Sequence, residues 1–123
     1  MKLTKNFSKS EFESKDGAEM PKEVLANIEK LAKFLQVIRD NTGRSITINS
    51  GYRSELYNEK IGGERKSQHL LGTAADIVVK DYTPKQVYDL IELLIEKGDL
   101  PEGGLKAYDT FTHYDIRGKK ARW

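Results

Sequence analysis

The sequence contains no cysteine, which excludes disulfides and means that any metal site must be built from nitrogen and oxygen ligands. It contains no apolar run approaching the roughly 20 residues that a membrane-spanning helix needs. Its 21 basic and 19 acidic residues nearly cancel, and the net charge of +2 is too small to indicate a nucleic-acid partner. Residues 1–7 lack the apolar segment of a secretory signal, so we expect none.

The composition is that of a folded protein. Hydrophobic residues make up 37% and charged residues 33% of the 123 residues, a length that suits one domain with one modest core. No internal repeat, low-complexity tract or long linker divides the chain. We therefore expect a single domain over residues 1–123, and we expect it to act as a monomer.

Two main helices are predicted by apolar residues at helical spacing. The first begins at Pro21, ends at Gly43, and has an apolar stripe of Val24, Leu25, Ile28, Leu31, Ala32, Leu35 and Ile38. The second begins at Pro84, with Thr83 as its cap, and stops at Gly98. A short helix is also possible between residues 52 and 60, before the break at Gly62-Gly63.

Four strands are predicted from apolar and β-branched runs, over residues 46–49, 74–79, 104–108 and 111–117. The predicted fold class is α+β, with a small, mostly antiparallel sheet and two main helices packed on it.

Aromatic side chains near both ends of the chain are expected to anchor those ends. Phe7 and Phe12 stand out in an otherwise polar segment, and Ser8-Lys9-Ser10-Glu11 has the pattern of a capped helical turn. Trp123 is expected to anchor the C-terminal residues in the core.

The two histidines and one aspartate form the most informative pattern. Asp76 begins the apolar run Ile77-Val78-Val79, where an unpaired carboxylate would be costly. Alternation puts His113 on one strand face with Phe111, Asp115 and Arg117. If the two strands are neighbours, Asp76 and His113 converge, and His69 can fold back to meet them. Two imidazoles and a carboxylate suit a zinc ion whose fourth position stays open to water.

The same residues also allow roles that involve no metal. A lone histidine on a strand is commonly a hydrogen-bonded structural or surface residue, and the His-x₆-Asp spacing is not specific by itself. Asp76 could pair with Arg53 or a lysine, and Asp115 could pair with Arg117 or Arg122.

Several motifs taken in order resemble the zinc D-Ala-D-Ala metallopeptidases. They are Ser50-Gly51-Tyr52-Arg53-Ser54, Tyr57-Asn58, Ser67-x-His69-x-x-Gly72-x-Ala74-x-Asp76, Phe111-x-His113-x-Asp115-x-Arg117 and Ala121-Arg122-Trp123. These enzymes cleave stem peptides of bacterial peptidoglycan and share their metal fold with lysostaphin-like enzymes and the hedgehog signalling domain. The resemblance extends from about Phe7 to Trp123 and is to the short branch of the family.

The resemblance implies roles for individual residues. The zinc ligands would be His69, Asp76 and His113. Arg53 would stabilise the tetrahedral oxyanion, although it could also be a structural or surface arginine. Ser67 would touch the substrate backbone or terminal carboxylate, or else serve as a turn or helix cap. Gln68 would help to line the pocket.

The general base departs from the family pattern. Many relatives carry an acid three residues before the last zinc histidine, where this chain has Thr110. Asp115 is our first candidate for the base, and Asp109 is the second. Asp115 could instead support a zinc ligand, or be a ligand itself if His113 were the base.

The expected function is zinc-dependent hydrolysis of peptidoglycan stem peptides or their cross-links. We expect an endopeptidase over a carboxypeptidase, because a chain this short has few residues to close a lid over an open groove. The expected place of action is the cell wall, in endolysin-like phage lysis or in the periplasm. The alternatives are a non-catalytic domain whose structural zinc supports binding to the wall or a protein, and a metal-free wall-binding module.

Overall fold

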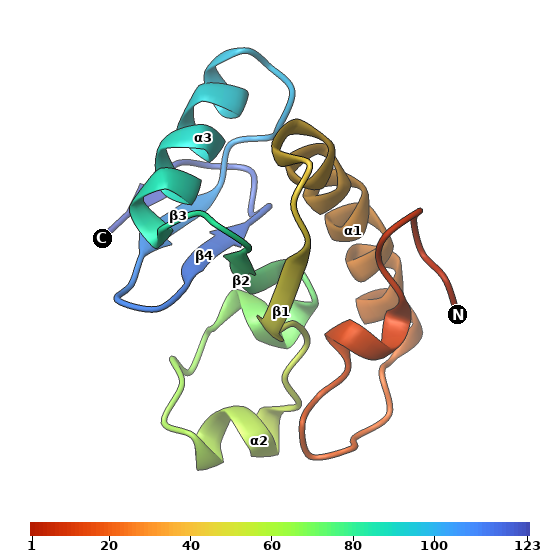
Figure 1. The fold of residues 1–123 in the computed structure, drawn as a ribbon. Helices are drawn as coiled ribbons and strands as arrows, with labels where there is room; N and C mark the ends of the chain where they lie inside the picture. Colours follow the sequence, from red (N-terminus) through yellow and green to blue (C-terminus); the bar gives the residue numbers. More distant parts are fainter.

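A computed structural model describes all residues from 1 to 123, and its main feature is one five-stranded sheet with helices around it (Figure 1). The strand order is β1-β2-β4-β3-β5, and every pairing except β3 with β5 is antiparallel. The elements are η1 (Lys9–Phe12), α1 (Lys22–Thr42), β1 (Ile46–Ser50), α2 (Glu55–Lys60), η2 (Gln68–Leu71), β2 (Ala74–Val79), α3 (Pro84–Glu96), β3 (Gly104–Ala107), β4 (Thr112–Asp115) and β5 (Ala121–Arg122). The α+β prediction is confirmed.

Both long helices form where the sequence predicts them. α1 ends at Gly43, whose φ of 65° is the left-handed conformation that glycine adopts at helix ends. Pro21 is the N-cap of α1, whereas the sequence predicts it as the first residue of the helix. α3 begins with the predicted capping box, in which the Thr83 hydroxyl accepts from the Gln86 amide and the Gln86 side chain accepts from the Thr83 amide. None of the helices is long and apolar enough to cross a membrane.

β2 is the strand that positions the site, because it pairs with both β1 and β4. Five of its six residues are buried, which explains why all of them except Asp76 are apolar. β5 is too short for sequence patterning to predict. It pairs in parallel with β3, and Arg122 ties it to Glu92 and Glu102 through ion pairs of 2.8 and 2.7 Å.

The core lies between the sheet and the helices, and α1 and α3 both contribute side chains to it. Phe7 and Phe12 are buried in this core, so the prediction that they anchor the N-terminal segment is confirmed. The prediction for Trp123 is wrong, because 54% of this residue is exposed. Trp123 follows β5, which is an edge strand of the sheet, and its side chain lies outside the core.

Candidate metal centre

The sheet register brings Asp76 and His113 face to face. They are directly opposite each other in the antiparallel pair of β2 and β4. Nδ1 of His113 lies 3.0 Å from Oδ1 of Asp76, and both residues are buried. Opposed side chains on such a pair are close enough to interact, so the register alone accounts for the contact. The two strands are therefore neighbours, as the predicted metal site requires.

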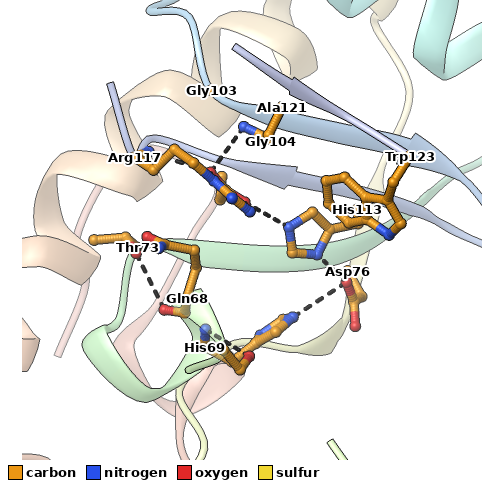
Figure 2. A network of polar contacts seen from close by, with 12 residues as sticks. Gln68, His69, Thr73, Asp76, Gly103, Gly104, His113, Arg117, Ala121 and Trp123 are labelled. Carbon is orange, nitrogen blue, oxygen red and sulfur yellow. Dashed lines mark hydrogen bonds and ion pairs between the residues drawn. The ribbon is translucent and has the colours of Figure 1, made fainter. Parts of the chain in front are cut away.

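His69 reaches the same carboxylate from η2. The Ser67 hydroxyl accepts from the His69 amide at the start of this turn, and Gly72 ends the turn with φ 76° before the chain enters β2. A Cβ at Gly72 would lie 2.8 Å from Val24, so the turn also needs glycine for close packing. Nε2 of His69 lies 3.3 Å from Oδ1 of Asp76, and Figure 2 shows both imidazoles directed at this aspartate.

The outward nitrogen of each imidazole has an acceptor. Nδ1 of His69 lies 2.7 Å from the Gly51 carbonyl oxygen, and Nε2 of His113 lies 2.7 Å from Oδ2 of Asp115. A carbonyl can only accept, and an ionised carboxylate also only accepts, so each outward nitrogen carries the proton. When the rings are neutral, as metal ligation requires, the inward nitrogens are then lone pairs. Acceptors placed behind metal-binding histidines fix the ring tautomer in this way.

The inward atoms form a donor set that suits a divalent cation. His69, Asp76 and His113 each offer one ligand atom, and these atoms lie within 4.8 Å of one another. With the outward nitrogens protonated, all three inward atoms are acceptors, and only a cation or added protons can hold them together. Two neutral imidazoles and one carboxylate are a zinc ligand set that leaves a position for water.

Asp76 is held as a carboxylate. Burial alone would raise its pKa, but when added protons on the inward nitrogens take the place of a cation, hydrogen bonds from His113 and His69 outweigh burial and lower the pKa of Asp76 well below the usual range. Its second oxygen, Oδ2, lies 3.3 Å from Nη2 of Arg53. The pairing with Arg53 considered from the sequence is thus present, and it uses the oxygen that does not face the imidazoles.

Asp115 lies behind His113, on the other edge of the imidazole from Asp76. It is fully buried and accepts hydrogen bonds from the Gly104 amide at 2.8 Å and from Arg117 Nε and Nη2 at 2.9 and 2.8 Å. Burial would raise its pKa, but the bonds from Arg117 and His113 outweigh burial and lower it. Both oxygens are therefore occupied, and neither faces the cluster side of His113.

Asp109 and Thr110 are also away from the cluster. Both are exposed in the connection between β3 and β4, and neither lines the cleft that opens over the ligands. The structure thus brings neither candidate for the general base to the inward side of the ligand set. A base has to reach the water that it deprotonates, and neither Asp115 nor Asp109 lies on that side of the ligand set in this structure.

The other predicted site residues do lie beside the cluster. The Arg53 guanidinium is held by Ser50 Oγ at 3.0 Å, Asn58 Oδ1 at 3.2 Å and Asp76. Ser67 has the capping role that was the alternative to substrate contact. Gln68 accepts a hydrogen bond from the Thr73 hydroxyl at 2.9 Å.

A cleft of about 770 Å³ opens over these residues. That volume is typical of sites for small ligands, which span about 300–1,000 Å³. Sequence reasoning missed several of its lining residues, namely Ile61, Glu64, Lys66, Tyr108 and Trp123. Alternation had put Phe111 and Arg117 on the His113 face, and both do line the cleft. Loop residues such as Glu64 carry no such signal.

Comparison with known proteins agrees with this geometry. The family model described as Peptidase M15 matches residues 2–115. The matched range contains the clustered residues His69, Asp76 and His113 as well as Arg53, Ser67 and Gln68. No curated protein matches the chain.

Proposed function

The chain belongs to the peptidase M15 family, and on this premise we propose that it is a zinc-dependent peptidase acting on peptidoglycan stem peptides or their cross-links. The observation that carries the proposal is the meeting of His69 Nε2, His113 Nδ1 and Asp76 Oδ1, with a proton acceptor behind each imidazole. These three residues would hold the ion. When bound, zinc supplies a Lewis acid for the peptide carbonyl and makes a water more acidic.

The residues around the ligands divide the remaining tasks. The Gly51 carbonyl and Asp115 keep the ring protons outward, so that neither histidine must lose a proton to its neighbour before binding a cation. Arg53 presents a fixed positive charge at the cleft wall, where it would stabilise the oxyanion that forms on the attacked carbonyl. Its contacts with Ser50, Asn58 and Asp76 hold the guanidinium in place before substrate arrives.

Ser67 and Gln68 have hydrogen-bonding capacity left for a substrate. The Ser67 oxygen accepts from the His69 amide, which leaves its hydroxyl proton to donate to a substrate carbonyl or carboxylate. The Gln68 oxygen accepts from Thr73, which leaves its amide group to donate. Both residues line the cleft beside His69, so they would position the substrate backbone.

We propose that the general base, which accepts a proton from the attacking water, is a carboxylate that lines the cleft. Apart from Asp76, the cleft has one such residue, Glu64, whose side chain is exposed. We assign Asp115 the task of orienting His113, and we rank Glu64 before Asp109 as the base. Glu64→Gln is expected to lower kcat strongly with zinc retained, whereas Asp109→Asn is expected to behave as the parent chain. If Asp109→Asn lowered kcat and Glu64→Gln did not, Asp109 would be the better candidate for the general base.

Cleavage within a chain fits the cleft better than removal of a terminal residue. A carboxypeptidase needs a cation that is free to bind the terminal carboxylate of its substrate. Arg53 and Arg117 line the cleft, but each already binds an aspartate, and the third lining cation, Lys66, is exposed in the loop between α2 and η2, where no ion pair fixes it beside the ligands. We therefore favour an endopeptidase, and we place its action at the cell wall, in phage lysis or in the periplasm.

The second candidate function is a non-catalytic domain with a structural zinc. It is favoured because Thr110 stands where many relatives carry an acid, and because neither Asp109 nor Asp115 lies on the inward side of the ligand set. The deciding experiment measures zinc content and then incubates the protein with purified peptidoglycan, with mass spectrometry of the released muropeptides. We expect bound zinc and new peptide ends, both lost in His69→Ala. Bound zinc without products, in a protein that unfolds when a chelator is added, would support the structural role. No zinc, and no change of Tm with chelator, would support the metal-free module.

A further inference from the structure

Trp123 is held at the cleft by an anchored strand. Its neighbour Arg122 binds Glu92 and Glu102 and also donates to the Gly103 carbonyl at 2.6 Å. The Ala121 amide donates to the same carbonyl at 3.2 Å. These contacts fix the backbone that carries Trp123, although the indole itself is not buried in the core.

The indole of Trp123 packs directly beside the candidate metal centre. Its ring centroid lies 5.3 Å from that of His113, with the rings at 66°, and Figure 2 shows it beside this imidazole. The Arg117 guanidinium lies 5.6 Å from the indole centroid. The indole N–H donates to the Tyr108 hydroxyl at 3.2 Å, and Tyr108 stacks on Phe111 at 4.7 Å. Contacts with His113, Arg117 and Tyr108 therefore fix the pose of Trp123.

These aromatic residues form one wall of the cleft, which we call the aromatic wall: Tyr108, Phe111 and Trp123. The other wall, which we call the polar wall, consists of residues 61–64 and 66–68 and is polar except for Ile61. Single exposed aromatic residues need no explanation, but three that adjoin one another and a ligand-binding cleft indicate a binding surface. The indole contributes most of it, since 54% of Trp123 and 37% of Tyr108 are exposed.

We propose that Trp123 is a specificity-determining residue, which binds an aliphatic side chain of the substrate residue flanking the scissile bond. This inference rests on the proposed peptidase function. The distance supplies the argument, because an extended peptide advances about 3.3–3.6 Å per residue. A wall 5.3 Å from a metal-binding imidazole is therefore within one or two residues of the carbonyl under attack.

The charges at the wall favour a neutral, apolar group. Arg117 lies against the indole, so a cationic side chain would be repelled there. The same guanidinium is bound at Nε and Nη2 by Asp115, which limits its use as an anion receptor. An aliphatic group gains most from this surface, because it removes exposed indole area from water without losing a hydrogen bond.

Steady-state kinetics on defined stem peptides, with zinc content measured in parallel, tests this role. We expect Trp123→Ala to raise KM by about fivefold to tenfold with zinc content unchanged, since the burial of one or two methyl-sized groups is lost. Trp123→Phe should restore most of the loss. Leu93→Ala is the matched control, because Leu93 is 51% exposed on α3 and does not line the cleft. An unchanged KM, or loss of zinc in proportion to activity, would overturn the inference.

Fluorescence gives a readout that does not depend on turnover. Trp123 is the only tryptophan of the chain, so its emission reports this wall alone. Stopped-flow mixing of the zinc-loaded protein with a free stem tetrapeptide should shift the emission before products accumulate. If only the same peptide carrying its muramyl sugar shifts the emission, the wall binds the sugar and the inference is wrong. An emission shift without any cleavage would refute the peptidase function and leave the binding surface standing.

Discussion

The substitution Gly104→Ala tests how the metal centre is supported from behind. Gly104 begins β3 and donates its amide to Oδ1 of Asp115. A Cβ at this position would lie 2.1 Å from Oδ2 of Asp115 and 2.7 Å from Nη2 of Arg117. Such contacts do not occur between relaxed atoms, so the carboxylate has to move. The glycine therefore matters for the space that it leaves to Asp115.

The size of the movement sets the expected effect. To reach a contact of 3.0 Å, Oδ2 has to retreat by about 0.9 Å. Such a retreat along the 2.7 Å contact with His113 Nε2 would lengthen it to about 3.6 Å, which is no longer a hydrogen bond. Losing a partner behind a metal-binding histidine weakens metal binding by about 10–100-fold, or about 1.4–2.7 kcal/mol. The crowding itself should destabilise the fold by about 1–3 kcal/mol.

Two measurements separate these effects. Competition with a chromophoric chelator gives the Kd for zinc of the folded protein, and urea unfolding of the zinc-free protein gives the free energy of unfolding. The control is Ile38→Val in α1, where a fully buried side chain loses one methyl group outside the metal centre. It should cost about 0.5–1.5 kcal/mol of stability and leave the Kd for zinc unchanged.

A folded Gly104→Ala variant that binds zinc as tightly as the parent chain would refute this reasoning. In that case Asp115 would not control the His113 tautomer, and its hydrogen bond would serve the fold alone. Equal weakening of zinc binding by Ile38→Val would refute it too, since general loosening would then explain both results.

Three further predictions concern other parts of the molecule. Arg53→Ala should lower kcat about 10²–10³-fold with zinc retained, as removal of one oxyanion-stabilising group does, and turnover of purified peptidoglycan checks this. Thr83→Ala should cost about 1 kcal/mol of unfolding free energy through the lost cap of α3, measured in urea, without changing the Kd for zinc. Hydrogen bonds from Arg122 lower the pKa of Glu92 and of Glu102 below 4.5, so their contribution to stability is present above that pH and is lost as the pH falls through the lowered values. Arg122→Gln should therefore flatten the loss of stability in acid, as followed by thermal unfolding over a pH series.

Much of the fold could be predicted because the signals are local. The capping box of α3, the glycine that ends α1 and the apolar run that follows Asp76 in β2 each specify an element from a few adjacent residues. β5 could not be predicted, because two residues carry no pattern and its pairing depends on ion pairs between Arg122 and residues 20 and 30 positions away. The exposure of Trp123 follows from the same cause, since its place depends on β5.

The meeting of the three candidate metal ligands could be anticipated from strand alternation and from one assumption, that the strands of Asp76 and His113 are neighbours. Asp76 and His113 lie on strands that could have been separated in the sheet, and the sequence does not state that they are paired. The order β1-β2-β4-β3-β5 supplies that fact. The polar wall of the cleft could not be anticipated, because Glu64 and Lys66 lie in a loop without periodic structure, between α2 and η2.

Asp115 shows where strand alternation stops being informative. Alternation places Asp115 beside His113, and the structure agrees. An imidazole, however, has two nitrogens on different edges, and alternation does not say which one meets the neighbour. Nδ1 of His113 faces Asp76 and Nε2 faces Asp115. Asp115 therefore holds the proton on Nε2 in place and is not positioned to accept a proton from a water in the cleft. The edge that Asp115 meets depends on the Gly104 amide and the Arg117 guanidinium, which hold the carboxylate where only Nε2 can reach it.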